Sequence, residues 1–306
     1  MRALVVGGGL IGSHLSLDLA TEGHSVVVYS RSFNPVLLQA KSERVELVDG
    51  ELPPAPGLLE LIEDADVVFC LVGSSSPEFS DADGPGSMLA SVVPVTNVLD
   101  LMRRTSTRHV VLASSGGTVY GRVESTPTSE THPTRPISLH GLNSLVVEQC
   151  ATFFQTVHGL EPIVLRFSNV YGPGQLARHG QGVLAAWCDA ISRDSAIMMI
   201  GDGETRRDFV YVADAVAAIR ASVRAAPGVY NVGGGGSWSL RDALALLEVV
   251  TGRQADVRTR PGRYVDVPVT HLDNSLIRQQ TGWEPHTPLR DGLTLMWNWI
   301  SARPKP

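Results

Sequence analysis

Short apolar runs alternate with segments of helical periodicity through the first half of the chain. The apolar runs lie at 3–6, 26–29, 45–48, 65–73, 109–113 and 162–167, and the helical patterns lie at 13–22, 58–63, about 88–104 and about 140–157. A continuous apolar run is typical of a strand that is buried on both faces of a parallel sheet. Strands that alternate with helices in this way predict an α/β fold with a doubly wound parallel sheet. We expect Pro94 to interrupt the third of these helices.

The first apolar run leads directly into a glycine-rich turn, Gly7-Gly8-Gly9-Leu10-Ile11-Gly12. Gly7, Gly9 and Gly12 have the G-x-G-x-x-G spacing of dinucleotide-binding βαβ units. One glycine makes the tight turn, the next lets a pyrophosphate approach the backbone, and the third lets helix and strand pack closely. Free N–H groups and the helix dipole then favour phosphates at the helix N-terminus. With the flanking strand, helix and second strand, this motif predicts a dinucleotide site.

The end of the second predicted strand leaves the identity of the dinucleotide open. An acidic residue there would accept hydrogen bonds from the adenosine ribose of NAD, but this chain has Tyr29-Ser30-Arg31. Ser30 would not repel the 2′-phosphate of NADP, and Arg31 could pair with that phosphate or stack on adenine. Arg31 is equally well explained as a solvated charge at a strand end. We predict NAD as the cofactor and keep NADP as the alternative.

The pattern changes after Ser168. Loops, short helices and isolated strands replace the regular alternation, and Ser239 and Asp242 have the spacing of a capping box that begins a helix. We therefore expect a dinucleotide-binding Rossmann domain at 1–168. Residues 169–306 would form a mainly substrate-binding lobe, some segments of which return to the first domain. The residues at 77–87 are expected to form a flexible, turn-rich segment.

Composition and charge exclude several classes of protein. Of the 306 residues, 43% are hydrophobic and 18% are charged, and the formal net charge is −6. Net negative charge argues against a nucleic-acid surface, and no apolar run is long enough to span a membrane. The strand that begins at Ala3 leaves no room for a signal peptide. Cys70, Cys150 and Cys188 are expected to be reduced core thiols of a cytoplasmic protein, and the histidines show no metal-ligand spacing.

Further motifs follow one another in a recognisable order. They are Ser115-Gly116-Gly117-Thr118-Val119-Tyr120-Gly121, Arg166-Phe167-Ser168-Asn169-Val170-Tyr171-Gly172-Pro173-Gly174, Arg207-Asp208-Phe209-Val210-Tyr211-Val212, Tyr230-Asn231-Val232-Gly233 and Gly282-Trp283-Glu284-Pro285. Together with the glycine turn they make the chain resemble the extended short-chain dehydrogenases. Within that group, the chain looks like the NAD-dependent epimerase/dehydratase family, of the UDP-glucose 4-epimerase type, which acts on nucleotide-linked sugars. The resemblance covers nearly the whole chain.

The resemblance implies a catalytic centre, and here the chain departs from the family pattern. In the family, a strand-end Ser or Thr and a Tyr-x-x-x-Lys pair remove a proton from a sugar hydroxyl while hydride passes to NAD+. In this chain, His140 occupies the Tyr position, Ser144 the Lys position, and Gly116 the usual Ser or Thr position. We expect His140 to act as the base, since a neutral imidazole readily accepts a proton. Ser115 or Thr118 would hydrogen-bond the reacting oxygen, and Ser144 cannot supply a positive charge.

The substrate-binding residues that the resemblance implies are better preserved. Arg207 and Arg263 stand where the family's two pyrophosphate-clamping arginines are expected, and Asp266 would orient Arg263. Two guanidinium groups suit a diphosphate because each presents its donors in a fixed fork. Asn169 matches a residue that contacts the nucleotide phosphate in the family. Gln181 begins the loop that lies beside the nucleobase of the substrate in the family. Taken singly, each arginine is also explained as a surface charge or a structural ion pair.

The resemblance also implies a wider set of cofactor contacts and a partner. Beside the three glycines, Ser30 and Arg31, the predicted cofactor-binding residues are Leu10, Ile11, Glu51, Leu71, Ser74 and Ser144. The helices at about 88–104 and 140–157 correspond to the pair that forms a four-helix dimer interface in relatives. We therefore expect a homodimer, although the apolar residues of these helices would serve equally well as ordinary core.

We interpret the chain as an NAD(P)-dependent epimerase or dehydratase. It would oxidise a nucleotide- or nucleoside-linked sugar transiently at a ring hydroxyl, with His140 as an atypical base. Two alternatives stay open. The missing Tyr and Lys fit a catalytically altered or inactive protein that binds dinucleotide and sugar nucleotide. They also fit an acid/base enzyme that uses His140 on the same scaffold without redox chemistry.

Overall fold

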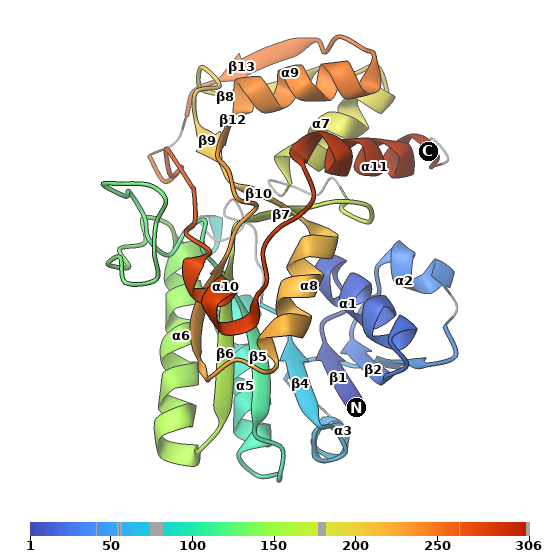
Figure 1. Cartoon of the computed structure of the whole chain (residues 1–306), viewed down its shortest axis with the longest axis vertical. Coiled ribbons are helices and arrows are strands. Elements are labelled where there is room, and N and C mark those ends of the chain that lie inside the picture. Colours follow the sequence, from blue (N-terminus) through green and yellow to red (C-terminus); the bar gives the residue numbers. More distant parts are fainter. Residues whose placement is uncertain are drawn as a thin grey trace.

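A parallel sheet forms the centre of the computed structural model (Figure 1), which describes residues 1–40, 42–53, 55, 57–73, 82–176, 182–262 and 264–303. Within this described part the sheet has seven strands in the order β11-β6-β5-β4-β1-β2-β3, and every neighbouring pair is parallel. The strands are β1 (Arg2–Val6), β2 (Ser25–Ser30), β3 (Val45–Asp49), β4 (Val67–Cys70), β5 (His109–Ser115), β6 (Glu161–Phe167) and β11 (Gly228–Val232). The predicted doubly wound α/β sheet is confirmed.

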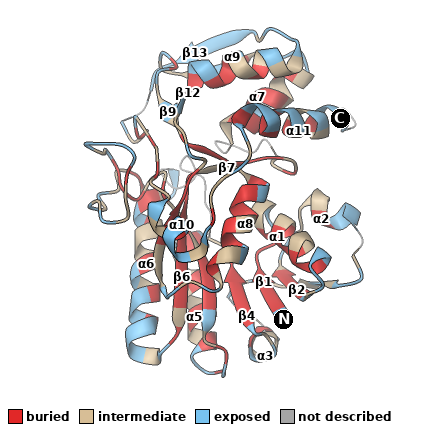
Figure 2. Ribbon diagram, viewed as in Figure 1, coloured by how far each residue is buried: buried red, intermediate tan, exposed pale blue. Residues whose placement is uncertain are grey.

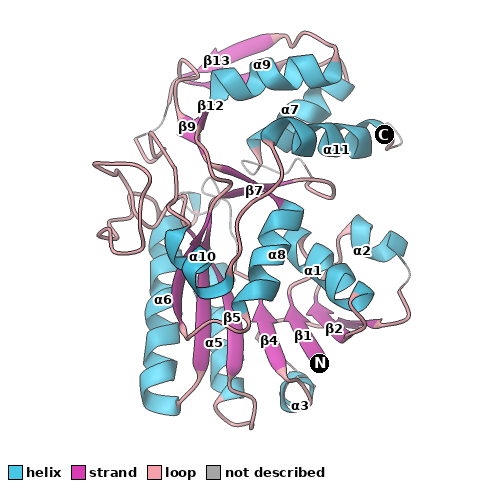
Figure 3. Cartoon of the chain, in the orientation of Figure 1, coloured by secondary structure: helices cyan, strands magenta, loops and turns pink. Residues whose placement is uncertain are grey.

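Helices cover both faces of this sheet, as the colouring by secondary structure shows (Figure 3). One face carries α1 (Leu10–Thr21), α2 (Pro35–Ala40), α8 (Val212–Ser222) and α10 (Ser275–Thr281). The other carries α3 (Leu58–Glu63), α5 (Gly84–Met102) and α6 (Leu139–His158). Side chains alternate along each strand, so that Val5 packs with the first group of helices and Leu4 with the second.

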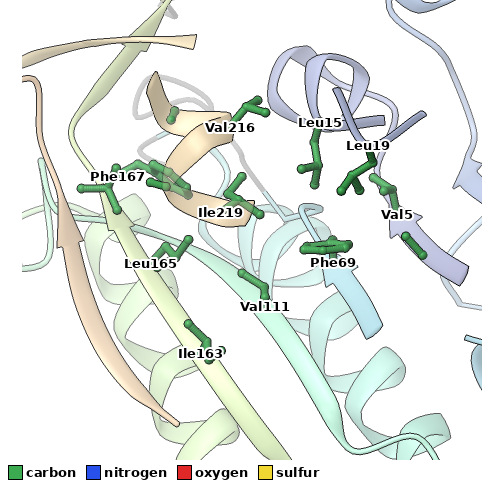
Figure 4. Packing of buried hydrophobic residues seen from close by; sticks show 14 of the residues in the cluster. Val5, Leu15, Leu19, Phe69, Val111, Ile163, Leu165, Phe167, Val216 and Ile219 are labelled. Carbon is green, nitrogen blue, oxygen red and sulfur yellow. The ribbon is translucent and has the colours of Figure 1, made fainter. Parts of the chain in front are cut away.

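The core between the sheet and α1 and α8 is made of apolar side chains, both aliphatic and aromatic (Figure 4). Leu15 and Leu19 of α1 are fully buried, as are Val5 of β1 and Phe69 of β4. Ile219 of α8 packs into the same cluster. Figure 2 shows that the buried residues follow the strands and the inner faces of the helices. This packing fixes where the carboxyl ends of the strands open toward a ligand.

The helix α5 differs from the prediction in two ways. Its N-cap is Asp83, whose carboxylate accepts a hydrogen bond from Gly86 N at 2.9 Å. Residues 84–87 are therefore helical and not part of a turn-rich segment, whereas 74–81 lie outside the described residues. The helix also continues through Pro94, so the expected interruption is wrong. Proline removes one backbone hydrogen bond, but Pro94 and the neighbouring Val95 are buried, and their packing holds the helix together.

Several segments from the second half of the chain form a smaller lobe with a core of its own. The helices α7 (Val183–Ser192), α9 (Leu240–Thr251) and α11 (Leu289–Ser301) pack around buried Trp187 and Met296. Short strand pairs support them: β7 (Asn169–Tyr171) with β10 (Phe209–Tyr211), β9 (Arg206–Arg207) with β12 (Trp238–Ser239), and β8 (Ile197–Ile200) with β13 (Val257–Arg260). The Ser239 side chain accepts a hydrogen bond from Asp242 N at 3.0 Å, which confirms the predicted start of α9.

Two of the three predicted core thiols are buried. Cys70 and Cys188 are buried free thiols, and Cys150 is a half-buried one. Burial raises the pKa of both buried thiols to about 12. Among the described residues, no helix is both long enough and apolar enough to cross a membrane.

A buried carboxylate just before β10 joins three other segments of the chain. Asp208 is fully buried and accepts hydrogen bonds from Leu272 N at 2.9 Å, Gly234 N at 2.6 Å and Ser168 Oγ at 3.2 Å. Burial raises the pKa of Asp208 to about 6, and these hydrogen bonds oppose part of that rise. These three hydrogen bonds, which we call the Asp208 clasp, fix the backbone next to Arg207. Arg207 is a predicted substrate-binding residue.

We expect the substitution Asp208→Asn to destabilise the protein by roughly 2–4 kcal/mol, because the amide NH2 group would face buried N–H donors. The matched control is Asp202→Asn, since Asp202 is exposed and its carboxylate accepts a local hydrogen bond from Glu204 N at 3.0 Å. Urea denaturation of the two variants measures the difference. Equal stability of both variants would contradict the role of Asp208 as a clasp.

Candidate active site

The glycine turn after β1 has the geometry that a dinucleotide needs. Gly7 has a φ of +117°, and a Cβ atom there would lie 2.9 Å from Leu71 O at the end of β4. A Cβ atom on Gly12 would collide with Gly7 O, so α1 packs directly on the turn. Gly9 differs, because no atom of the described residues, apart from its two chain neighbours, lies within 4 Å of its Cβ position. The glycine that should face the pyrophosphate is thus the one with open space above it.

Among the described residues, no side chain caps the N-terminus of α1. Gly9 is the N-cap, no side-chain cap is made, and the first turn holds no acidic residue. The first N–H groups of the helix therefore keep their capacity to bind an anion. The structure brings together six predicted cofactor-binding residues at this place: Gly7, Gly9, Leu10, Ile11, Gly12 and Leu71. Ser74 lies outside the described residues.

At the end of β2, fewer side chains are positioned to contact a cofactor than the sequence suggested. Ser30 Oγ donates a hydrogen bond to Ser32 O at 2.7 Å, and Arg31 is exposed. Glu51 is also exposed, and its backbone carbonyl accepts a hydrogen bond from Tyr29 Oη at 3.1 Å. Whether Ser30, Arg31 and Glu51 contact a cofactor stays a prediction.

Sequence reasoning missed two residues that hold a loop over this turn. Asn34 Nδ2 donates to Gly174 O at 2.9 Å, and His14 Nε2 lies 2.8 Å from Pro173 O. Burial lowers the pKa of His14, and the contact with Pro173 opposes part of that effect. The Cβ position of Gly174 is 3.4 Å from a methyl group of Leu10. The loop after β7 is thus held against the start of α1, and its partners are more than a hundred residues away in the sequence, where no local pattern could reveal them.

Two hydroxyl groups meet at the carboxyl end of β5. Thr118 Oγ1 donates a hydrogen bond to Ser115 Oγ at 2.7 Å, and both residues are half-buried. Gly116 lies between them in a tight space, since a Cβ atom there would be 2.6 Å from a methyl group of Leu272 and 2.9 Å from Arg166 O. A serine or threonine does not fit at position 116 without a shift of backbone. The hydroxyl groups are supplied from both sides of it instead.

The helix α6 begins against this hydroxyl pair. Its N-cap is Ser138, which accepts a hydrogen bond from Gly141 N at 3.2 Å. A Cβ atom on Gly141 would lie 2.6 Å from Thr118 O, so the first turn of the helix packs directly on the loop that carries Thr118. His140 precedes Gly141 in this turn and is half-buried. We call residues 115–121, which carry Ser115 and Thr118, the hydroxyl loop. The predicted base therefore belongs to the turn of α6 that touches the hydroxyl loop.

Ser144 does not replace the lysine of the family pattern. Its hydroxyl donates a hydrogen bond to His140 O at 3.0 Å, one helical turn earlier. A serine that bonds the i−4 carbonyl is engaged with its own helix. It adds no positive charge to the site, and its predicted contact with the cofactor stays a prediction.

Arg207, a predicted substrate-binding residue, carries a partly desolvated positive charge. Its Nη1 donates to Val267 O at 2.7 Å and to Arg206 O at 2.9 Å. Burial lowers the pKa of Arg207 to about 10, and the charge of Asp266 opposes part of that fall. Asp266, predicted to orient Arg263, thus interacts electrostatically with Arg207 in the described structure. A cation that is short of water is well suited to bind an anion.

The other predicted substrate residues are only partly described. The side-chain oxygen of Asn169 lies 3.8 Å from the Cβ position of Gly117, which places it beside the hydroxyl loop. Arg263 and Gln181 lie outside the described residues. No group of three or more His, Cys, Asp or Glu side chains in the described ranges could hold a metal ion.

Comparison with known proteins agrees with this geometry. Residues 3–233 match the model of the NAD dependent epimerase/dehydratase family. The UDP-glucose 4-epimerase of Mycolicibacterium smegmatis is 32% identical over 302 residues, which are 96% of each chain. The crystal structure of the Thermus thermophilus UDP-glucose 4-epimerase in complex with NAD has a TM-score of 0.92 and 26% identity, with 99% of each chain covered.

A second solved structure agrees over the same length. It is the UDP-glucose 4-epimerase of Thermotoga maritima with UDP-glucose, which has a TM-score of 0.90 and 28% identity and covers 98% of each chain. The family model spans the glycine turn, the hydroxyl loop and the start of α6, which are the parts that build the site described above. The chain therefore belongs to the NAD-dependent epimerase/dehydratase family.

Proposed function

We propose that the chain binds NAD and interconverts the epimers of a UDP-linked sugar through transient oxidation of a ring hydroxyl. One observation carries the proposal. The open glycine turn after β1 and the Ser115–Thr118 pair after β5 lie at the same edge of one parallel sheet, and α6 begins against that pair. The three relatives described above are UDP-glucose 4-epimerases, which favours a UDP-sugar and epimerisation over dehydration.

The residues of the glycine turn fit the cofactor. The open face of Gly9 and the unmasked N-terminus of α1 suit a pyrophosphate. Bound NAD would supply the hydride acceptor and donor for the sugar carbon. NAD is favoured over NADP because the Thermus thermophilus relative was crystallised with NAD, and because Ser30 and the exposed Arg31 form no fixed site for a 2′-phosphate.

The remaining residues take the roles that their positions allow. His140 removes the proton from the reacting sugar hydroxyl, and the Ser115–Thr118 pair holds the oxygen of that hydroxyl by hydrogen bonds. Arg207 holds the substrate diphosphate as a desolvated cation, and Asn169 contacts the same nucleotide beside the hydroxyl loop. Arg263 and Gln181 would complete the clamp.

A second candidate function is a protein that binds NAD and a UDP-sugar without turnover. The specific observation in its favour is Ser144 at the lysine position. Serine carries no charge, and the hydroxyl of Ser144 donates a hydrogen bond to His140 O of its own helix. The two functions differ in one measurable way. Only the epimerase reduces its nicotinamide transiently when a sugar nucleotide is added.

Denaturing the purified protein and identifying the released dinucleotide by mass spectrometry tests the cofactor first. NAD should be recovered. Addition of UDP-glucose or UDP-galactose to the native protein should then produce a transient rise in nicotinamide absorbance and the epimeric sugar nucleotide. Retained NAD that no UDP-sugar reduces would instead support the binding protein, and an empty protein that fails to bind added dinucleotide would contradict both functions.

The contrast between Gly9 and Gly12 predicts two different defects. Gly9→Val should keep the fold, because its backbone conformation is extended and its Cβ position is open, but it should abolish NAD binding. Gly12→Ala should lower the thermal midpoint, because the added carbon meets Gly7 O. Calorimetry and NAD titration measure both. Normal NAD affinity in Gly9→Val would show that the turn does not hold the pyrophosphate.

Substitution of the predicted base separates His140 from Ser144. His140→Phe should lower kcat by about 10²–10⁴-fold, the usual contribution of a general base. Ser144→Ala should stay within about threefold of the wild type, because the lost hydroxyl bonds only a helix carbonyl in the structure. Both variants must retain NAD for the comparison. Full turnover in His140→Phe would remove His140 from the mechanism.

We also propose a homodimer that pairs α5 and α6 with the same helices of a second chain. These helices pack side by side, and each exposes apolar side chains: Leu89 on α5 is 64% exposed, and Phe153 and Val157 on α6 are 53% and 56% exposed. Apolar residues repeated on one exposed helix face are typical of a contact surface.

Glutamates in this surface should therefore separate the chains. The double variant Phe153→Glu, Val157→Glu is expected to sediment at half the mass of the wild type, since the two charges would be buried between copies. Leu38→Glu is the matched control, because Leu38 on α2 is 52% exposed but lies outside the proposed interface. A monomeric wild type, or a double variant that stays dimeric, would contradict the proposal.

A further inference from the structure

A buried ion pair lies beneath the candidate catalytic centre. Arg166 on β6 donates to Glu148 on α6 through Nη2 at 2.6 Å and through Nε at 3.0 Å. Their side chains are only 7% and 4% exposed. The two parallel hydrogen bonds engage both carboxylate oxygens, which fixes the angle between helix and strand as well as their distance.

Two further side chains bond to this pair. Ser114 Oγ donates to Glu148 Oε1 at 2.5 Å. Arg166 Nη1 donates to Tyr120 Oη at 2.9 Å, and the guanidinium also lies 4.9 Å from the centre of the Tyr120 ring. Tyr120 Oη in turn donates to Asn231 Oδ1 on β11 at 2.7 Å. We call Ser114, Tyr120, Glu148 and Arg166 the buried cluster.

The buried cluster touches each segment that carries a predicted catalytic group. Ser114 immediately precedes Ser115 on β5, and Tyr120 follows Thr118 by two residues in the hydroxyl loop. Glu148 lies on α6, the helix whose first turn contains His140. We propose that the Glu148–Arg166 pair, with Tyr120 as its link to the hydroxyl loop, sets the position of His140 relative to Ser115 and Thr118. These are positioning residues, and this inference rests on the proposed function.

Stability alone accounts poorly for such a pair. Removing two charges from water costs free energy that their attraction only partly returns, and apolar residues of similar volume often stabilise a protein as well or better. A pair with two parallel bonds does supply a fixed geometry, which a packed apolar contact supplies less strictly. A catalytic centre needs such geometry, because an error of about 1 Å in placement can cost a hundredfold in rate.

The centre of this chain has particular need of external positioning. The hydroxyl pair and His140 come from separate segments, and the first turn of α6 packs on the loop at Gly141, whose Cβ position lies 2.6 Å from Thr118 O. A glycine contact limits approach but does not prevent sliding. The buried cluster holds the far side of both segments, so that the loop and the helix move as one unit.

Three variants test the proposal. Tyr120→Phe removes only the hydroxyl and keeps the ring over Arg166. The triple variant Ser114→Ala, Glu148→Leu, Arg166→Met replaces the charged group by apolar residues and leaves no serine hydroxyl without an acceptor. Tyr230→Phe is the matched control, because Tyr230 is also buried but donates its hydroxyl hydrogen to Ala226 O at 2.7 Å, outside the buried cluster.

The expected result is a loss of kcat in proteins that are folded and retain NAD. Tyr120→Phe should lower kcat about tenfold and the triple variant about a hundredfold, both with KM within about twofold of wild type, because substrate binding does not depend on this alignment. Tyr230→Phe should keep the wild-type kcat. Wild-type kcat in the folded triple variant would show that the pair is only structural. If the triple variant does not fold, wild-type kcat in Tyr120→Phe overturns the proposal.

Hydrogen exchange gives a second readout that needs no turnover. Amides at 115–121 and 139–145 should exchange faster in Tyr120→Phe than in Tyr230→Phe, while those of β1 and α1 stay unchanged in both. A wild type without epimerase activity would refute the proposed function and leave this readout to decide the positioning role. Unchanged exchange in both segments of Tyr120→Phe would then overturn it.

Discussion

The direct packing of α1 on the turn after β1 is the contact on which the site depends. Because Gly12 has no side chain, the helix approaches Gly7 O closely and its N-terminus points to the end of the sheet. Every strand of the main sheet runs in the same direction, so the loops after β1, β4, β5 and β6 open on that same edge. A cofactor bound at α1 and a substrate bound at the hydroxyl loop after β5, as proposed, would therefore be neighbours through sheet topology alone.

What the sequence predicted well is local in origin. Buried strands, the glycine turn and the Ser239 cap each depend on residues within about a dozen positions, so their patterns survive without tertiary information. Pro94 was misjudged because its local preference yields to packing between α5, α6 and the sheet. The contacts of His14 with Pro173 and of Asn34 with Gly174 join segments far apart in the chain, and no periodicity encodes such pairs.

The hydroxyl loop shows why residue-by-residue transfer from a family pattern is incomplete. The pattern places a Ser or Thr at position 116, but the space beside Gly116 is filled by Leu272 and by the backbone of Arg166. The bond between Thr118 and Ser115 supplies two hydroxyl groups at nearly the same place. Sequence indicated both residues as candidates, yet only the structure shows that they form one hydrogen-bonded pair.

The proposed base, His140, differs from the tyrosine of the family pattern in its need for a nearby positive charge. The lysine of the family pattern favours the ionised form of a tyrosine, which is otherwise protonated near neutral pH. An imidazole is largely neutral in that range and accepts a proton without such help. A cation beside His140 would instead disfavour its protonated form and weaken it as a base. Two arginines among the described residues have other surroundings: burial lowers the pKa of Arg207, and Arg166 is paired with Glu148. Under the proposed function, in which His140 is the base, no tyrosine has to be ionised, and a serine at position 144 is therefore compatible with the chemistry.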